Sequence, residues 1–403
     1  MVLTAILLLS LNLRPTAVSI GPVLDEVRAG LDMGAGSAGL LTSLPVIAFA
    51  VFGALAPVAA RTIGAHRVTF AALLAVILGL SGRAVVDHEA SFLALSMLAL
   101  AGMAMANVLL PSLVRLHFPD RIGRVTGLYT TALSVGLTAA IVLTVPVADA
   151  LGGWRWGLGI WAIVALVAAA PWLGLLRRDV RTDARTDAGP AAESVRDIRF
   201  LDVARTRLGW AMVLFFGLQS LQAYAVFGWF ATLWRDAGFS AAQAGGLVGV
   251  VAAMSIPLSL WAPPMVARPG DQRWVLYLVV GCYPVAYLGL VASPHRLALL
   301  WAVILGVALA TFPIILVLIG LRTRSPGGTA ALSGFTQSLG YLMAAVGPFG
   351  VGTLREASGG WTVPLLVLTG LSLPLLAVAW YVGQPTTIED QLAGRVEPGT
   401  PAT

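Results

Sequence analysis

The sequence predicts an all-helical integral membrane protein whose twelve transmembrane helices form two pseudo-symmetric six-helix bundles. Three observations support this fold class. Hydrophobic residues make up 58% of the 403 residues and charged residues only 11%. The mean hydropathy of +0.88 lies outside the range of soluble domains. Short motifs also recur at one spacing along the chain, which indicates a duplicated unit.

Apolar runs bounded by turn and charge signals mark the expected helices, because a helix needs about 20 mostly apolar residues to cross the hydrocarbon core. The twelve expected spans are 2–24, 37–60, 67–86, 91–114, 125–148, 154–176, 209–233, 243–266, 273–292, 296–320, 329–354 and 361–383. The expected domains are a six-helix bundle at 1–176, a cytoplasmic linker at 177–207, a second bundle at 208–385 and a cytoplasmic tail at 386–403. We expect the linker to be partly disordered, with an amphipathic end lying on the membrane.

The repeated motifs lie at equivalent places in the two predicted bundles. Their members are Pro57 and Pro263 in related Ala-Pro segments, Gly152–Trp154 and Gly359–Trp361, and Ala29–Leu31 and Ala237–Phe239. Each pair is separated by 206 to 208 residues. Six spans are an even number, so the two halves have the same orientation in the membrane. This parallel repeat is typical of transporters built from two rocking domains.

The net charge of +6 is explained by membrane topology and not by nucleic-acid binding. All 25 basic residues are arginine. Most of them lie in the linker, the tail and the loops on one side of the membrane, which by the positive-inside rule places both termini in the cytoplasm. Met1 does not begin a secretory signal peptide, because no basic region or cleavage site follows it. The single cysteine, Cys282, excludes an internal disulfide and a metal site with several thiolate ligands.

Arg14 is the most informative residue of the first span, because it lies near the middle of an apolar stretch. An arginine facing lipid at that depth costs from about 3 to more than 10 kcal/mol. The twelve expected spans hold no aspartate or glutamate near their centres that could neutralise it. We therefore expect Arg14 to face protein, water or a ligand, and its planar guanidinium suits a carboxylate, a nitro group or a linear anion.

Local motifs in both halves resemble one family. The chain resembles the major facilitator superfamily, and within it the branch of cyanate and 2-nitroimidazole transporters. The matching segments are Asn12–Pro15, Ser19–Pro22, Leu41–Pro45, Asn107–Pro111, Thr126–Tyr129, Gly217–Gln222, Gly320–Arg322 and Gln337–Tyr341. The loop between the second and third spans departs from the family pattern, since Arg61 stands where an aspartate is usual.

The resemblance implies that polar residues of several spans surround one substrate-binding space. The expected substrate-binding residues are Arg14, Asn12, Asn107, Tyr129, Gln219, Gln222, Gln337 and Tyr341. Asn12 and Arg14 cannot point the same way on a regular helix, so Arg14 carries more weight. For each amide alone, a structural hydrogen bond between helices is an equally good interpretation. Glycines at 127, 136, 334, 340 and 347 are expected to permit close helix packing.

Together these features predict a secondary active transporter of a small anionic or nitro-bearing solute that works by alternating access. We expect a multi-pass monomer in the cell inner (plasma) membrane, with no cofactor and no metal. A multidrug-type exporter of hydrophobic compounds is one alternative, and a non-transporting membrane sensor is another. An enzyme is disfavoured because no nucleophile, base and orienting group converge. Coupling to the solute gradient and coupling to protons both remain open.

Overall fold

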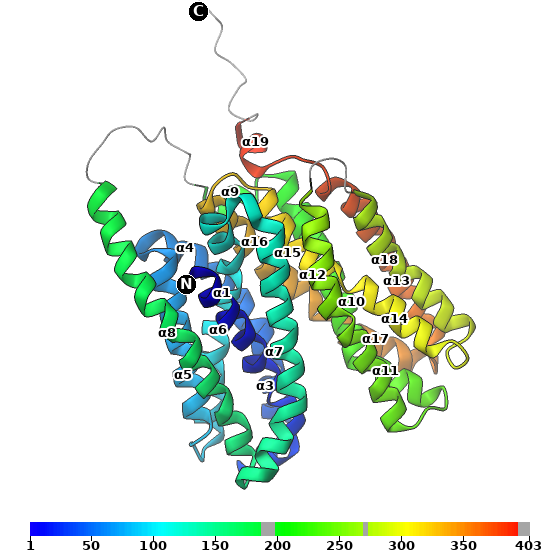
Figure 1. The fold of residues 1–403 in the computed structure, drawn as a ribbon. Coiled ribbons are helices and arrows are strands. Elements are labelled where there is room, and N and C mark those ends of the chain that lie inside the picture. The colour runs from blue at the N-terminus through cyan, green and yellow to red at the C-terminus, as the bar shows by residue number, and fades with distance from the viewer. Residues whose placement is uncertain (187–197, 269–272, 394–403) are drawn as a thin grey trace, which may run out of the picture. The chain divides into compact units, whose positions relative to one another are not determined.

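The computed structural model describes residues 1–186, 198–268 and 273–393, and within these residues the regular structure is helical throughout. Helices are expected here because only they satisfy every backbone polar group of a single segment inside lipid. The chain divides into two compact units, and Figure 1 labels their helices along a colour scale that follows residue number from blue to red. Unit 1 comprises Met1–Pro119, Leu128–Phe200 and Ser325–Gly334, and unit 2 comprises Asp120–Gly127, Leu201–Arg324 and Phe335–Thr403.

The first half of the chain supplies eight α-helices. They are α1 (Val2–Val18), α2 (Leu24–Gly30), α3 (Ala35–Ala48), α4 (Ala54–Ile63), α5 (Ala65–Arg83), α6 (Glu89–His117), α7 (Ile122–Leu151) and α8 (Trp154–Thr186). Short turns of other helix types are η1 (Gly21–Val23), η2 (Phe49–Gly53) and η3 (Pro119–Arg121). In unit 1, α1 packs against α8 and α6, and α5 packs against α6 and α8 (Figure 1).

The second half of the chain supplies eleven helices. They are α9 (Phe200–Val203), α10 (Arg207–Asp236), α11 (Ala241–Ala253), α12 (Ser255–Val266), α13 (Arg273–Ala292), α14 (Ala298–Ala308), α15 (Thr311–Leu321), α16 (Pro326–Ala344), α17 (Val346–Ser358), α18 (Thr362–Val382) and α19 (Ile388–Ala393). In unit 2, α13 packs against α18 and α14, while α10 packs against α18, α11 and α17.

By length and composition, eleven segments of the described residues can cross a membrane. They correspond to eleven of the twelve expected spans. The remaining one, expected at 329–354, is instead two helices, α16 and α17, that meet at Ala345. Its hydropathy is too low for a crossing segment because α16 carries many polar residues, among them Thr336 and Gln337. Both of these side chains are buried.

Helices occupy both ends of the predicted linker, 177–207. Helix α8 continues as far as Thr186, so the first residues of the segment 177–207 are helical. Helix α9 and the start of α10 occupy its end. The intervening residues 187–197 lie outside the described residues, and so does the predicted disorder.

The repeated Gly-Gly-Trp motif ends a helix in both halves. Gly152 follows α7 with φ 88°, and Gly359 follows α17 with φ 67°. Both conformations are left-handed, a region in which glycine carries no steric penalty and which commonly ends a helix. The repeat detected in the sequence is thus a repeated helix stop.

Polar contacts hold the ends of α15 and α18 together in unit 2 and attach α19 to α10 and α18. The guanidinium of Arg322 donates to the carbonyl oxygens of Val382 and Gly383 at the end of α18, at 2.8 and 2.9 Å. Burial lowers the pKa of Arg322 to about 10, so it remains a cation at neutral pH. The Gln391 side chain accepts from the Leu208 backbone at 3.1 Å and donates to the Tyr381 hydroxyl at 2.9 Å. Hydrogen bonds from Thr387 lower the pKa of Asp390.

Candidate functional site

In unit 1, Asn12 is occupied in joining two helices. Its side chain is fully buried, and Nδ2 donates to the Trp161 carbonyl of α8 at 3.1 Å. The indole of Trp161 in turn donates to the Thr144 hydroxyl of α7 at 3.1 Å. Asn12 was expected to contact substrate together with Arg14. Its donor instead makes a structural hydrogen bond between helices, the other interpretation that the sequence allowed.

Pro15 leaves a carbonyl of α1 without its usual partner, and α7 covers that carbonyl closely. Proline has no N–H, so the Leu11 carbonyl receives no hydrogen bond from position 15. Gly136 of α7 lies directly against it, and a Cβ built on Gly136 would stand 2.0 Å from the Leu11 oxygen. Only glycine permits this approach, as the sequence predicted for position 136.

Arg83, at the end of α5, fixes the C-terminal end of α1. It is completely buried and donates to the Thr16 carbonyl at 3.3 Å and to the Ser19 hydroxyl at 2.9 Å. Among the described side chains, no carboxylate pairs with it. Arg83 is not among the residues predicted from the sequence to have a role. The position of Arg83 at the end of an apolar run, before the turn, was the available signal.

These anchors define how Arg14 is oriented. Asn12, Thr16 and Ser19 lie on one side of α1, since positions i, i+4 and i+7 share a helix face, and that side faces α8 and α5. Arg14 is two residues from both Asn12 and Thr16, so it projects from roughly the opposite side at 100° per residue. Its side chain is half-buried. Arg14 therefore points away from the helices that anchor α1.

The other two predicted residues of unit 1 are buried in its interior. Asn107 of α6 is 4% exposed, and Tyr129 of α7 is fully buried. Both are on helices that belong to the same unit as α1.

In unit 2, Gln219 of α10 is held by a network of hydrogen bonds. Its Nε2 donates to the Phe216 carbonyl at 3.1 Å and to the Ser220 hydroxyl at 2.6 Å. Its Oε1 accepts from the Thr311 hydroxyl of α15 at 3.4 Å, and the Tyr283 hydroxyl of α13 lies 3.2 Å from the same Thr311 oxygen. All the side chains of this network are buried.

Gln222, one turn further along α10, contrasts with Gln219. It is also fully buried, but neither Oε1 nor Nε2 has a hydrogen-bond partner within the described protein. The residue does not contribute to the network around Thr311. The Gln222 amide can therefore still form hydrogen bonds to another group, whereas the Gln219 amide already has its partners.

The predicted residues of α16 lie next to α10. The rings of Tyr341 and Phe216 meet edge to face, with centroids 4.9 Å apart, and Tyr224 is 6.4 Å from Tyr341. Gln337, one turn before Tyr341, is fully buried. Unit 2 thus brings together its four predicted residues on two adjacent helices.

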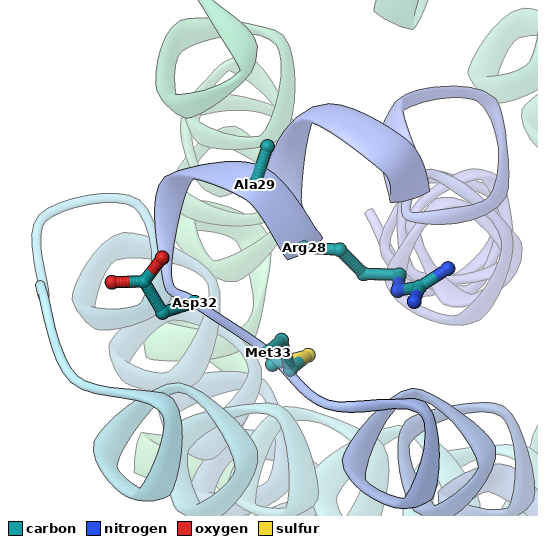
Figure 2. Close-up of a pocket in the computed structure, with 4 residues that line it drawn as sticks. All are labelled: Arg28, Ala29, Asp32 and Met33. Atoms are coloured by element: carbon teal, nitrogen blue, oxygen red, sulfur yellow. The ribbon is translucent and has the colours of Figure 1, made fainter.

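A pocket of about 450 Å³ lies elsewhere in unit 1, at the end of α2 and the residues that follow it. Its lining residues are Arg28, Ala29, Asp32 and Met33. Figure 2 shows the Arg28 and Asp32 side chains pointing away from each other. No predicted site residue lines this pocket, and its two charged groups do not converge on a common ligand. The described residues also contain no group of three or more histidine, cysteine, aspartate or glutamate side chains that could hold a metal.

Two helical units with buried polar side chains inside apolar segments define a polytopic membrane protein of the transporter type. The chain belongs to the major facilitator superfamily, whose family model matches residues 2–348. This confirms the family resemblance and the predicted fold class.

Relatives and solved structures agree with this assignment. The chain is 33% identical to the 2-nitroimidazole transporter of Escherichia coli (strain K12), over 93% of each protein. It is 27% identical to the cyanate transport protein CynX of the same organism, over 94% of this chain and 97% of the relative. A solved structure of the proton:xylose symporter XylE superposes with a TM-score of 0.75 at 15% identity, over 98% of both chains. At that identity the likeness to XylE concerns the fold alone.

Proposed function

We propose that this transporter carries a small anionic or nitro-bearing solute, such as cyanate or a 2-nitroimidazole, by alternating access as a secondary transporter. The names of two relatives support this substrate class. The chain acts in the plasma membrane as a monomer, with both termini in the cytoplasm. The solute-binding residues are Arg14, Asn107 and Tyr129 in unit 1 and Gln222, Gln337 and Tyr341 in unit 2, while Asn12 and Gln219 orient the helices that carry them.

The orientation of Arg14 is the observation that carries this proposal. Arg14 lies in the interior of the first membrane-crossing segment, Val2–Val23. The anchors at Asn12, Thr16 and Ser19 turn it away from α5 and α8. A cation at this depth attracts an anionic or nitro group, and its planar fork binds two oxygen atoms at once. A lysine offers a point charge without this geometry.

The test is uptake of labelled cyanate and labelled 2-nitroimidazole into proteoliposomes, with and without a pH gradient. The parent protein should show saturable uptake of at least one solute. Arg14→Ala and Arg14→Lys should both reduce the uptake efficiency by about 10- to 100-fold, the effect of losing a charge-assisted hydrogen bond. A dependence on the pH gradient would identify proton coupling.

Arg155→Ala is the matched control. Arg155 is also an arginine of unit 1, but it pairs with the exposed Asp87 at 2.6 Å and surface pairs contribute little. Its loss should leave uptake unchanged. If the parent moves neither solute, the proposed substrate class is wrong. If Arg14→Ala transports as well as the parent, the role of Arg14 is wrong and the substrate class stands.

A further inference from the structure

The two glutamines of α10 differ sharply in what their side chains bind. Gln219 uses both amide groups in hydrogen bonds to Phe216, Ser220 and Thr311. Gln222 is equally buried and uses neither. A buried amide without partners is unfavourable for folding. In a native protein such a group needs an explanation, and a role in function is one.

The network around Gln219 also holds a break in the tenth predicted span. Helix α14 ends at Ala308 and α15 begins at Thr311. The Thr311 hydroxyl shares its proton between the Ala308 carbonyl at 2.9 Å, across this break, and Gln219 Oε1 at 3.4 Å. A hydroxyl has one proton but can accept as well, so the Tyr283 hydroxyl at 3.2 Å can complete the chain by donating to Thr311. The chain thereby links three helices, α13, α15 and α10.

Tyr287 provides an internal comparison with Tyr283. Both tyrosines are fully buried on α13, four residues apart, and their rings stack with centroids 6.0 Å apart. The Tyr287 hydroxyl has no hydrogen-bond partner among the described residues. The two residues therefore share their environment and differ in whether the hydroxyl makes a hydrogen bond.

We infer that Gln222 is the glutamine of α10 that contacts the solute, and that Tyr283 and Thr311 are positioning residues that hold Gln219 and the break between α14 and α15. This inference rests on the proposed function and refines the substrate class. A glutamine amide offers an acceptor and two donors in one plane. It matches a planar group that presents an N–H beside an oxygen acceptor, as a nitroimidazole ring does. Cyanate offers acceptors alone and engages only the amide nitrogen.

The first experiment measures thermal unfolding of the purified protein in detergent without any solute. Gln222→Met removes an unpaired buried amide and should raise the unfolding midpoint by about 2 °C or more. Gln219→Met leaves Thr311 without its amide partner and should lower the midpoint by a similar amount. Tyr283→Phe should lower it, whereas Tyr287→Phe, the same change on the same helix, should leave it unchanged or higher.

Two outcomes would overturn the inference at this stage. One is a loss of stability in Gln222→Met that equals the loss in Gln219→Met. The other is equal damage by Tyr283→Phe and Tyr287→Phe. Because no solute is present, this comparison tests the assignment of the two glutamines even if the proposed substrates are wrong.

The second experiment measures the KM and the maximal rate of 2-nitroimidazole uptake in proteoliposomes. Gln222→Met should raise the KM at least about tenfold, the effect of losing a hydrogen bond of the usual buried strength. Tyr283→Phe should raise the KM less, and should add nothing in the Gln219→Met background because both changes interrupt one network. Combined with Gln222→Met, its effect should add fully. Tyr287→Phe should behave as the parent.

A parent-like KM in Gln222→Met, in a protein that transports, would overturn the inference while leaving the proposed function intact. Additive effects of Tyr283→Phe and Gln219→Met would remove the positioning role of Tyr283. A parent that transports neither solute would contradict the proposed function, and the order of unfolding midpoints would then decide the assignment within α10.

Discussion

A buried arginine needs a compensating negative charge, and for Arg83 the end of α1 supplies it. The last carbonyls of a helix lack intrahelical partners and together carry about half a negative charge. Arg83 donates to one of them, the Thr16 carbonyl, and to the Ser19 hydroxyl beside it. The same arrangement recurs in unit 2, where Arg322 donates to the carbonyls at the end of α18. Arginine suits both places because its guanidinium reaches two acceptors at once.

Arg83→Lys should therefore weaken the attachment of the C-terminal end of α1. The lysine ammonium lacks the planar fork of the guanidinium and cannot reach both the Thr16 carbonyl and the Ser19 hydroxyl. Losing one buried hydrogen bond to a charged group costs about 1.5–3 kcal/mol. Backbone amides in residues 14–24 should exchange at least about tenfold faster, since 1.4 kcal/mol corresponds to a factor of ten. Hydrogen-exchange mass spectrometry of the protein in nanodiscs measures this.

Arg155→Lys is the comparison for this experiment. Arg155 also donates to a carbonyl, that of Val86 at 2.7 Å, and pairs with Asp87, whose side chain is 80% exposed. Exchange around it should change little, because surface ion pairs contribute at most about 1 kcal/mol. Equal changes in exchange rate in the two variants would show that the burial of Arg83 does not strengthen its hydrogen bonds to α1.

At the scale of the elements, helices in each unit approach one another through glycine. In unit 1 the contact of α7 with α1 depends on Gly136. In unit 2 a Cβ on Gly347 of α17 would stand 2.5 Å from the Leu221 carbonyl of α10. Both glycines were predicted from the sequence to permit close packing, and the structure confirms it. Small residues let transmembrane helices approach until backbones touch.

Gly136→Ala should separate α7 from α1 and destabilise the protein by about 1–3 kcal/mol, the usual cost of overpacking. Thermal unfolding in detergent measures it. Gly370→Ala in the interior of α18 is the control, because a Cβ there meets nothing within 4 Å. That change should be neutral or stabilise by up to about 1 kcal/mol, since alanine favours helix over glycine. A similar loss in both variants would contradict the packing argument.

At the scale of the whole molecule, we expect the α16–α17 pair to cross the membrane although its hydropathy is low. The polar residues of α16 are buried in protein and do not face lipid, as intramembrane polar residues usually are. An alkaline phosphatase reporter fused after Ser325 or at the C-terminus should be inactive, because the positive-inside rule predicts both points to be cytoplasmic. Fused after Gly360 it should be active. A fusion after Gly153 is the positive control, and equal activity after Ser325 and Gly360 would exclude a crossing.

Much of the fold followed from residue pattern alone. Long apolar runs located eleven crossing segments, because lipid admits few other structures for a single segment. The Gly-Gly-Trp repeat located two helix stops. The expected spans at 243–266, 296–320 and 329–354 are each divided between two helices, since composition does not reveal where a membrane helix breaks. Likewise, the sequence could not reveal that α8 extends into the predicted linker.

The candidate site was harder to predict, because partners distant in sequence decide what each polar side chain does. Asn12 and Arg14 were both expected to bind substrate, and the hydrogen bond from Asn12 to the Trp161 carbonyl, 149 residues away, could not be predicted from the sequence. Gln219 and Gln222 share a helix face, and Thr311 distinguishes them. Arg83 escaped notice since burial at the end of a span depends on the neighbouring helices.

The contacts that hold α1 have a consequence for how such a protein can diversify. Two of these contacts, the packing of Gly136 on the Leu11 carbonyl and the hydrogen bond of Arg83 to the Thr16 carbonyl, involve main-chain oxygens, which every amino acid possesses. The side chain at position 11 can therefore vary by mutation without loss of the contact, whereas Gly136 and Arg83 on the neighbouring helices cannot vary without losing it. Asn12 and Ser19 do not share this freedom, because their side chains make the hydrogen bonds themselves, so sequence drift on α1 is confined to its other positions while the placement of the helix is inherited unchanged.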